Sequence, residues 1–292
     1  MHRMSIGSRL FDAVNLIFLT CFALITVLPF VYVIAGSFTT TTELLKKGFV
    51  LIPTVYSLEA YHYIFSTPII IRSLLNTIYI TLLGTFLNLV FTSLMAYPLA
   101  RKALFMRRGI MLMVIFSMLF SGGMIPSFLV VKELHLINTY WALMIPGLIS
   151  AFNLIILKNF FQELPDGIEE SAKIDGCNDL GILLRIVLPL SMPVIATLTL
   201  FYAVGHWNSF FSAIIYLNQS DKWPIQVILR QIVIMSEGGL FDSSGFGPEY
   251  VTPPSQSIKM AVIVVATAPI LVVYPFLQKH FAKGVLLGSV KG

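Results

Sequence analysis

Charged residues are scarce in this sequence. Only 11% of its 292 residues are charged and 57% are hydrophobic, whereas soluble domains are about 25% charged and 45–50% apolar. This composition excludes an ordinary soluble globular protein. The formal net charge of +5 does not come from one basic patch, so the sequence predicts no binding to nucleic acid.

Cysteine and the common catalytic motifs are also rare or missing. The two cysteines, Cys21 and Cys177, lie in an apolar run and in a distant polar loop, which excludes a disulfide framework and a pair of neighbouring metal ligands. The histidines show no HExxH spacing, and no Gly-x-Ser-x-Gly elbow occurs. We therefore expect no catalytic residue and no metal site. A membrane-embedded enzyme would need active-site residues scattered across several spans.

A nucleotide-binding motif is absent as well. A P-loop ends in Lys followed by Ser or Thr, because the lysine and the hydroxyl serve phosphate and Mg²⁺, and no lysine of this chain is followed by either residue. We therefore expect no cofactor in this chain. In an ATP-driven system, ATP and Mg²⁺ would be bound by a partner ATPase.

Long uncharged runs are what the sequence has instead. Six of them reach helix-spanning length, because a helix needs about 20 apolar residues to cross a bilayer. They predict an all-α membrane protein with six transmembrane helices, at about 13–36, 73–100, 109–131, 138–157, 191–217 and 260–278. The connecting loops are too short for a separate domain, so residues 1–292 are expected to form a single transmembrane domain.

The basic residues indicate which side of this domain faces the cytoplasm. Assigning the ends and loops alternately to two sides places twelve of the 19 basic residues together, namely Arg3, Arg9, Arg101, Lys102, Arg107, Arg108, Lys158, Lys173, Arg185, Lys279, Lys283 and Lys291. The positive-inside rule makes this side cytoplasmic. Both termini and the loop 158–190 are therefore predicted to be cytoplasmic.

The expected spans carry no ionised residue. Membrane carboxylates and lysines usually carry proton or sodium coupling, and repeated arginines form voltage sensors. Their absence from the expected spans disfavours an ion-driven transporter and a voltage sensor. It also favours a neutral substrate, although polar groups alone can carry an anion.

The loop 158–190 contains a short helix with both ends marked. Asp166 is a good N-cap, and Glu169 three residues later completes a capping-box pattern. Gly176 is placed to end the helix in the left-handed conformation, and Asp179 can cap a second short helix. These signals predict a compact projection outside the membrane that suits docking into another protein.

Several motifs resemble those of ABC importer permeases. Their EAA loop has the form Glu-Ala-Ala, three residues, Gly, nine residues and Ile-x-Leu-Pro, and this chain has Glu170-Ser171-Ala172, Gly176 and Ile186-Val187-Leu188-Pro189. Ser171 replaces the usual alanine. Similar matches lie at Ser-Leu-Leu-Asn-Thr (73–77), Ala-Tyr-Pro-Leu-Ala-Arg (96–101) and Trp-Asn-Ser-Phe (207–210). The end of the chain, 283–292, is similar to the carbohydrate-importing branch, in the subunit like the smaller maltose-transporter permease.

The resemblance implies a type I ABC importer permease of a bacterial or archaeal plasma membrane, surrounded by lipid. The implied partners are a second permease, two ATPase subunits at the EAA loop, and an extracytoplasmic solute-binding protein that delivers a carbohydrate, expected to be an oligosaccharide. The residues implied in ATPase coupling are Glu169, Glu170, Ser171, Ala172, Asp175, Gly176, Ile186 and Pro189. Taken alone, the same pattern would describe only a solvated helix and a turn.

A sugar path needs hydrogen-bonding groups and aromatic faces inside the bundle. His206, Trp207 and Asn208 in the fifth span and Asn153 in the fourth are the candidates, although polar groups in a membrane commonly hold helices together instead. The outer loop 218–257 is expected to contact the binding protein. The remaining alternatives are a membrane-embedded enzyme or scaffold, and an ABC permease for a solute other than a sugar.

Overall fold

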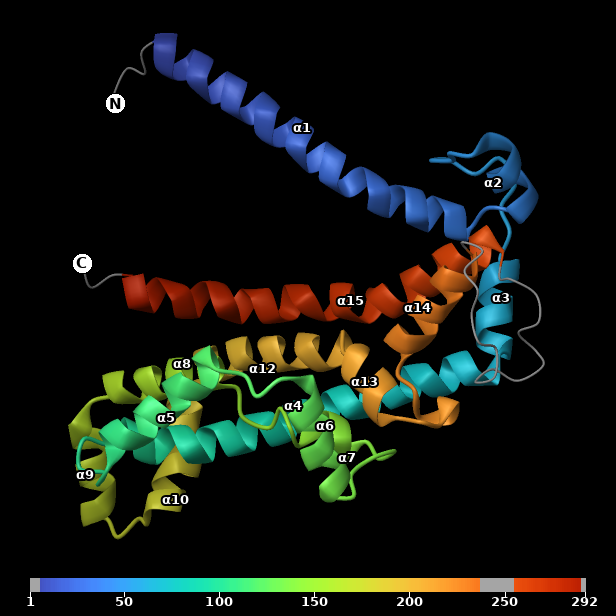
Figure 1. Ribbon diagram of the computed structural model, residues 1–292. Helices are drawn as coiled ribbons and strands as arrows, with labels where there is room; N and C mark the ends of the chain where they lie inside the picture. The colour runs from blue at the N-terminus through green and yellow to red at the C-terminus, as the bar shows by residue number, and fades with distance from the viewer. Residues whose placement is uncertain (1–5, 237–254, 290–292) are drawn as a thin grey trace. The chain divides into compact units, whose positions relative to one another are not determined.

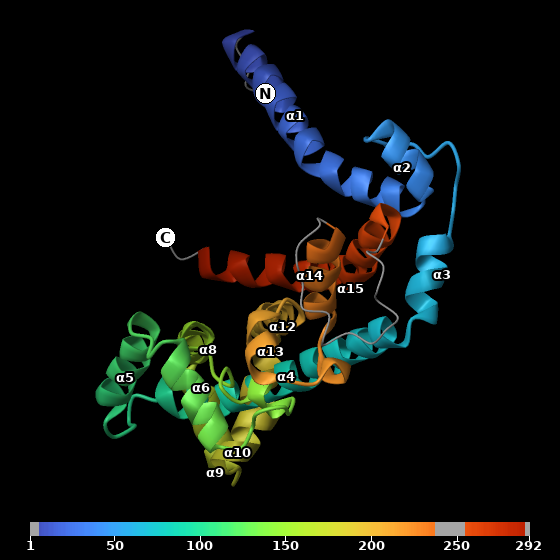
Figure 2. The ribbon, with the colours of Figure 1, turned by 45° about the vertical axis from the view of Figure 1, so that its right-hand side comes forward.

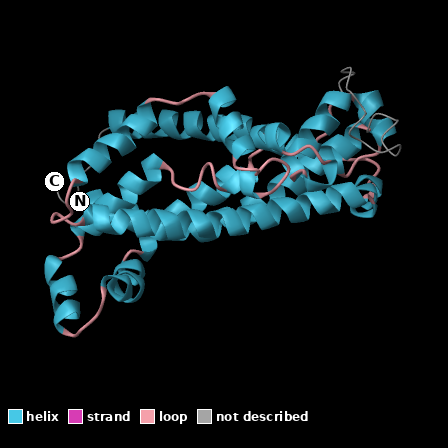
Figure 3. Cartoon of the chain, turned by 60° about the horizontal axis from the view of Figure 1, so that its bottom comes forward, coloured by secondary structure: helices cyan, strands magenta, loops and turns pink. Residues whose placement is uncertain are grey.

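The computed structural model describes residues 6–236 and 255–289. These residues are mostly helical (Figure 1), and Figure 3 draws no strand among them. Their only β-pairing is an isolated bridge between Thr39 and Tyr56. The all-α class predicted from the sequence is therefore confirmed. The chain divides into two units, Met1–Ile71 with Leu229–Thr267 and Arg72–Ile228 with Ala268–Gly292, and each is described by itself.

The first unit contains the helix that begins the described chain. Its helices are α1 (Ile6–Ser37), α2 (Thr41–Lys47) and α3 (Glu59–Ser66), followed by the later part of α14 (Ile225–Ser236) and the first part of α15 (Gln256–Ser289). Every side chain from residue 11 to residue 31 is exposed, and nearly all are apolar. Such a surface suits contact with lipid rather than with water.

The segment after α1 is held together by one buried carboxylate. Glu43 accepts hydrogen bonds from Lys47 Nζ at 2.7 Å, the Thr54 amide at 3.0 Å and the Val55 amide at 3.1 Å. The bond from Lys47, followed by those from Thr54, lowers the pKa of Glu43 from 4.5 to about 2. Glu43 thereby joins α2 to the extended chain that follows it.

The second unit holds most of the remaining helices. They are α4 (Pro68–Ala100), α5 (Arg107–Leu119), α6 (Met124–Glu133), α7 (Trp141–Met144), α8 (Ala151–Glu163), α9 (Asp166–Ile174), α10 (Asp179–Ile182), the π-helical η1 (Leu183–Val187), α11 (Leu188–Leu190), α12 (Met192–Trp207), α13 (Phe211–Tyr216) and the 3-10 turn η2 (Ser220–Lys222). The helices α4, α5, α8 and α12 run alongside one another, with α9 and α10 at one end (Figures 1 and 2). A core of buried side chains from α4, α8, α10 and α12 joins them, including Leu99, Leu157, Ile182 and Leu198.

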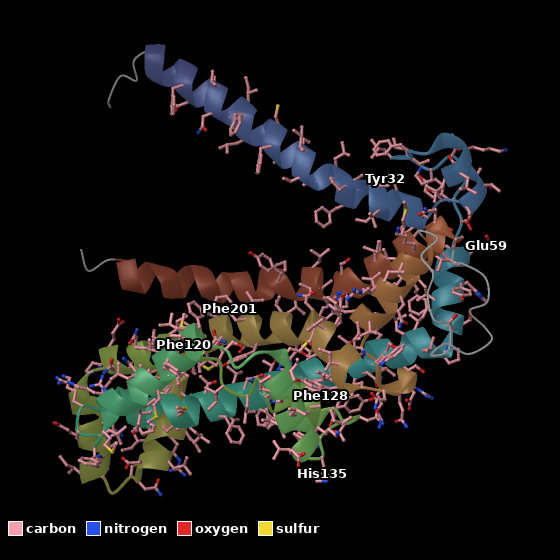
Figure 4. All side chains as sticks on the ribbon, viewed as in Figure 1. Tyr32, Glu59, Phe120, Phe128, His135 and Phe201 are labelled. Carbon is pink, nitrogen blue, oxygen red and sulfur yellow. The ribbon has the colours of Figure 1, made fainter. Side chains whose placement is uncertain are left out.

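Three of the six predicted spans are interrupted. The third bends by 116° between α5 and α6, with Phe120 just after α5 and Phe128 within α6 (Figure 4). The turn uses Gly123 at φ +88°, a backbone conformation that side chains rarely adopt. The fifth predicted span, 191–217, breaks at residues 208–210 into α12 and α13.

The fourth predicted span, 138–157, is corrected most. Only α7 and the first half of α8 are helical there, because the chain turns at Pro146 and Gly147 before Ser150 caps α8. Proline lacks the amide that a continuous helix needs. By length and composition, the described residues contain three membrane-spanning helices, or up to five if each bent pair forms one span. This count lies below the predicted six because an uncharged run does not reveal where its helix breaks.

Candidate functional site

The EAA-like loop, residues 158–190, begins within the last turns of α8 and then forms a helical hairpin of α9 and α10. Its first helix, α9, begins at Asp166, and Pro165 occupies the N-cap without a side-chain cap bond. The prediction that Asp166 is the cap was therefore wrong by one residue, because Pro165 already has extended backbone angles and ends the preceding chain. Glu169 points to another partner instead of closing a capping box, since it pairs with Arg101.

The end of α9 is confirmed as predicted. Gly176 has φ +81°, its amide bonds to the Lys173 carbonyl, and the Cys177 amide bonds to the Ala172 carbonyl. This pair of bonds is the Schellman arrangement, in which a left-handed residue satisfies the last carbonyls of a helix. Glycine suits the position because an added side chain would be strained there.

The second helix of the hairpin, α10, also starts one residue away from the expected cap. The side chain of Asn178, rather than Asp179, accepts from the Gly181 amide at 2.7 Å. Asp179 is then the first helical residue, and its carboxylate faces Lys173 and Arg101. The chain continues through η1 and α11, where Ile186 is partly buried and Pro189 is exposed, and bends by 86° into α12.

The two faces of α9 differ in what they contact. Ala172 is 5% exposed and packs in the core with Ile182 and Leu183. Glu170, Ser171, Asp175 and Gly176 are exposed. The hairpin therefore packs on the helix bundle through Ala172 and leaves a separate outer face exposed.

The residues predicted for a substrate path do not gather in one cavity. His206 Nε2 lies 2.6 Å from Asn88 Oδ1, and the Asn88 amide donates to the carbonyls of Gly147 and Leu148 at 2.8 Å. His206 thus takes part in a contact between α12, α4 and the turn before α8. Such a contact is the helix-packing alternative that the sequence left open.

The other three path candidates lie in different surroundings. Asn208 is exposed and donates to the Val204 carbonyl of its own helix at 3.0 Å. Asn153 is buried in the first turn of α8, where its amide bonds to Ser150. Trp207 is buried, and it lines a cavity of about 510 Å³ between α4, α12 and α15.

Two threonines in the wall of the cavity beside Trp207 have hydroxyls without a hydrogen-bond partner in the described structure. Thr81 and Thr85 are 9% and 6% exposed, and their Oγ1 atoms have no hydrogen-bond partner among the described residues. Phe86 and Tyr274 line the same cavity. The cavity surface is almost wholly apolar, because both hydroxyl oxygens are buried. Its aromatic rings are what could stack against a sugar.

A comparison with protein families identifies the family of the chain that carries this hairpin. The family described as "Binding-protein-dependent transport system inner membrane component" matches residues 88–287, which include the whole EAA-like loop and the cavity residue Trp207. The chain belongs to this family. The family resemblance read from the loop motifs is thereby confirmed.

Individual relatives agree with that assignment. The permease is 62% identical to the Polygalacturonan/rhamnogalacturonan transport system permease protein YtcP of Bacillus subtilis, over 98% of this chain and 99% of that one. It is 57% identical to Protein LplC of the same organism, over 100% and 98%. Its fold is similar to a chain in the crystal structure of a bacterial ABC transporter that imports the acidic polysaccharide alginate, with a TM-score of 0.87, 31% identity and coverage of 96% and 100%. The type I ABC importer permease fold is therefore confirmed.

The permease has surface residues that the motif did not point to. Ile174, two residues after the EAA positions, is 86% exposed, and Leu180 and Leu184 are 54% and 55% exposed. Exposed apolar side chains surrounded by polar residues are typical of a protein-binding surface. The sequence could have suggested Ile174, because it is an apolar residue in the last turn of an otherwise polar helix.

Proposed function

We propose that this permease is a transmembrane subunit of an ATP-driven importer for an oligosaccharide derived from an acidic polysaccharide. The observation that carries the substrate class is the 62% identity, over nearly the whole chain, to a relative named for polygalacturonan and rhamnogalacturonan transport. The alginate importer with the same fold has a name of the same chemical class. Polar groups without charge can carry such an anion, so the uncharged spans are compatible with this substrate.

The EAA-like loop is proposed as the cytoplasmic contact with an ATPase subunit. The exposed members Glu170, Ser171 and Asp175 would meet the ATPase directly, together with Ile174. Gly176 and Pro189 would shape the hairpin, while the buried Ala172 and the partly buried Ile186 would transmit its movement to the bundle. Closure of the ATPases on ATP would then rock the bundle between inward-open and outward-open states.

The proposed assembly follows from the family. It contains a second permease, two ATPases that hold ATP and Mg²⁺, and an extracytoplasmic binding protein, in a bacterial or archaeal plasma membrane. Residues 1–292 would act as one transmembrane domain with both termini in the cytoplasm. The loop 218–257 remains our candidate for contact with the binding protein, although most of it, 237–254, lies outside the described residues.

Part of the oligosaccharide path is proposed to pass the cavity beside Trp207. The support is the aromatic part of its lining, Trp207, Phe86 and Tyr274, because sugar rings stack on aromatic faces. His206, Asn208 and Asn153 remain predicted path residues. The bond of His206 to Asn88 on another helix supports a packing role for His206 instead. Asn208 bonds to its own helix, and only the backbone N–H of Asn153 bonds to Ser150.

Uptake by whole cells tests the proposed substrate class. A strain lacking this permease should lose uptake of labelled oligogalacturonides, and the wild-type chain supplied in trans should restore it. Labelled maltose oligosaccharides and a labelled amino acid serve as neutral and non-sugar comparisons. Loss of amino-acid uptake with normal oligogalacturonide uptake would contradict the proposal and favour a permease for another solute.

A further inference from the structure

The side chain of Arg101 joins the end of α4 to both helices of the EAA-like loop. Its Nη1 atom lies 2.8 Å from Glu169 Oε2 on α9, and its Nη2 atom lies 3.4 Å from Asp179 Oδ1 on α10. Asp179 is shared with Lys173 of α9, at 3.6 Å. One guanidinium therefore connects a membrane helix with the two helices of the hairpin.

The guanidinium is held in place from the side of α4. Its carbon lies 4.4 Å from the centre of the Tyr97 ring, and the Tyr97 hydroxyl also accepts a hydrogen bond from Arg101. Tyr97 is one turn earlier in α4 and packs edge-on against Phe161 of α8. Arginine suits this position because its planar fork can stack on a ring and bond carboxylates at once, whereas lysine offers only a point charge.

The ion pair is partly shielded from water. The side chains of Arg101 and Glu169 are 23% and 26% exposed, so solvent screens their attraction less than that of a surface pair. The Asp179 side chain is 69% exposed, which makes it the weaker partner. Glu169 is therefore the principal contact between α9 and Arg101.

The space around this pair is not filled by apolar packing. A cavity of about 310 Å³ lies between the end of α4 and the start of α9, and Arg101, Gln162 and Glu169 line it. Gln162 also donates to the Ala100 carbonyl at 3.2 Å. On this side of α9, polar bonds rather than close-packed side chains connect the hairpin to α4.

We propose that Arg101 is a positioning residue that transmits movement of the EAA-like loop to α4, acting through Glu169. The proposal rests on the proposed ATPase contact of the loop. It divides the two adjacent acids of α9 by role: the exposed Glu170 faces the ATPase, while Glu169 faces inward and holds Arg101. A pull on α9 then acts on α4 through a charged bond as well as through the packing of Ala172.

The test uses the assembled transporter in proteoliposomes with its binding protein and a labelled oligogalacturonide. The variants are Arg101→Gln and the nearly isosteric Glu169→Gln, with Lys102→Gln as a matched control that removes an adjacent exposed cation. The Arg101→Gln and Glu169→Gln variants should each transport about tenfold less substrate per ATP hydrolysed than wild type, within the usual range of coupling between sites. Subunit association and thermal stability should change little, and the control should stay within twofold of wild type.

The double variant Arg101→Gln/Glu169→Gln tests whether the two residues affect coupling through their contact with each other or independently. If the pair acts as one unit, the double variant should lose no more coupling than either single variant. Additive losses would overturn the proposal. So would a transport per ATP in Arg101→Gln and Glu169→Gln that matches the Lys102→Gln control. If Arg101→Gln fails to assemble, Glu169→Gln alone decides the outcome by the same ratio.

Failure of the broader function would look different. A wild-type transporter that hydrolyses ATP without moving the oligosaccharide would contradict the proposed substrate. Unchanged ATPase binding in Glu170→Ala would contradict the proposed docking face. Normal wild-type transport with normal coupling in Arg101→Gln would contradict only the role of Arg101.

Discussion

The imidazole of His206 occupies the space that a side chain on Gly84 would need. A Cβ atom built on Gly84 would lie 2.6 Å from His206 Nε2 and 2.8 Å from its Cε1 atom. The same nitrogen lies 2.6 Å from Asn88 Oδ1, one turn further along α4. The missing side chain at Gly84 thus lets α12 bring its histidine close enough to reach Asn88.

Gly84→Ala should destabilise the permease by displacing His206. Forcing an extra methyl group into a packed contact typically costs about 1–3 kcal/mol, and the bond between His206 and Asn88 should lengthen or break. Thermal unfolding of the purified transporter measures the effect. Gly205→Ala is the control on α12, because a Cβ there meets nothing within 4 Å, and equal stability of the two variants would contradict the packing argument.

Substitution of Asn88 distinguishes helix packing from substrate contact at His206. Asn88→Ala removes the group that bonds His206 and two carbonyls, and interhelical bonds of this kind average about 0.6 kcal/mol, with a maximum near 1.7. We expect a lower unfolding temperature and an unchanged KM for uptake. A raised KM at unchanged stability would instead identify the His206 region as part of the substrate path.

The left-handed turn at Gly176 predicts an order among variants of the EAA-like loop. A Cβ there has open space but the backbone has φ +81°, so Gly176→Ala should cost about 1–2 kcal/mol of conformational energy. Gly176→Asn should cost less, because asparagine tolerates this conformation. ATPase association measured by co-purification should fall in the same order, whereas Gly167→Ala within α9 should leave it unchanged. Equal effects of Ala and Asn would contradict a purely conformational role.

The buried Glu43 carboxylate predicts a pH dependence of the segment after α1. Since its pKa is lowered in the folded chain from 4.5 to about 2, its contribution is complete above pH 4.5 and is lost as the pH falls towards 2. Glu43→Gln should mimic the acid state, with faster hydrogen exchange at the amides of Thr54 and Val55 at neutral pH. Unchanged hydrogen exchange at these two amides in Glu43→Gln would contradict the role of Glu43. Glu59→Gln is the control, in which this exchange should match wild type.

The cavity beside Trp207 predicts a substrate effect of two threonines. Thr81→Val and Thr85→Val keep the shape of the side chain but remove hydroxyls that have no partner in the described structure. Both oxygens are buried, so the proposed path requires them to turn towards the cavity as substrate passes, and the KM for oligogalacturonide uptake should then rise several-fold. Stability should change little, because no internal hydrogen bond is broken. Thr197→Val, whose hydroxyl bonds to the Pro193 carbonyl, is the control. An unchanged KM in both Thr81→Val and Thr85→Val would exclude these hydroxyls from the path.

The sequence by itself determined the class of the protein and the ends of its most informative helix. Scarcity of charge and long apolar runs require a helical membrane protein. Inside a bilayer no water can bond the backbone N–H and C=O groups, so a continuous apolar run must satisfy them within its own helix. Gly176 could be predicted as a helix end because local backbone geometry depends on the residue itself. The caps at Pro165 and Asn178 were missed by one residue, since neighbouring residues compete closely for such positions.

Tertiary structure decided where the spans break and what each polar residue contacts. The bends at residues 120–123 and 208–210, and the turn at Pro146, lie inside uncharged runs. Gly122-Gly123 and Pro146-Gly147 are residues that permit a break, but only the packing of the helices decides that the chain turns there. Tertiary structure also distinguishes the adjacent acids Glu169 and Glu170. The Glu169 side chain pairs with Arg101, 68 positions earlier in the chain, whereas the Glu170 side chain is exposed. Contacts between residues so distant in the chain depend on how the helices pack, and composition and local spacing do not encode that packing.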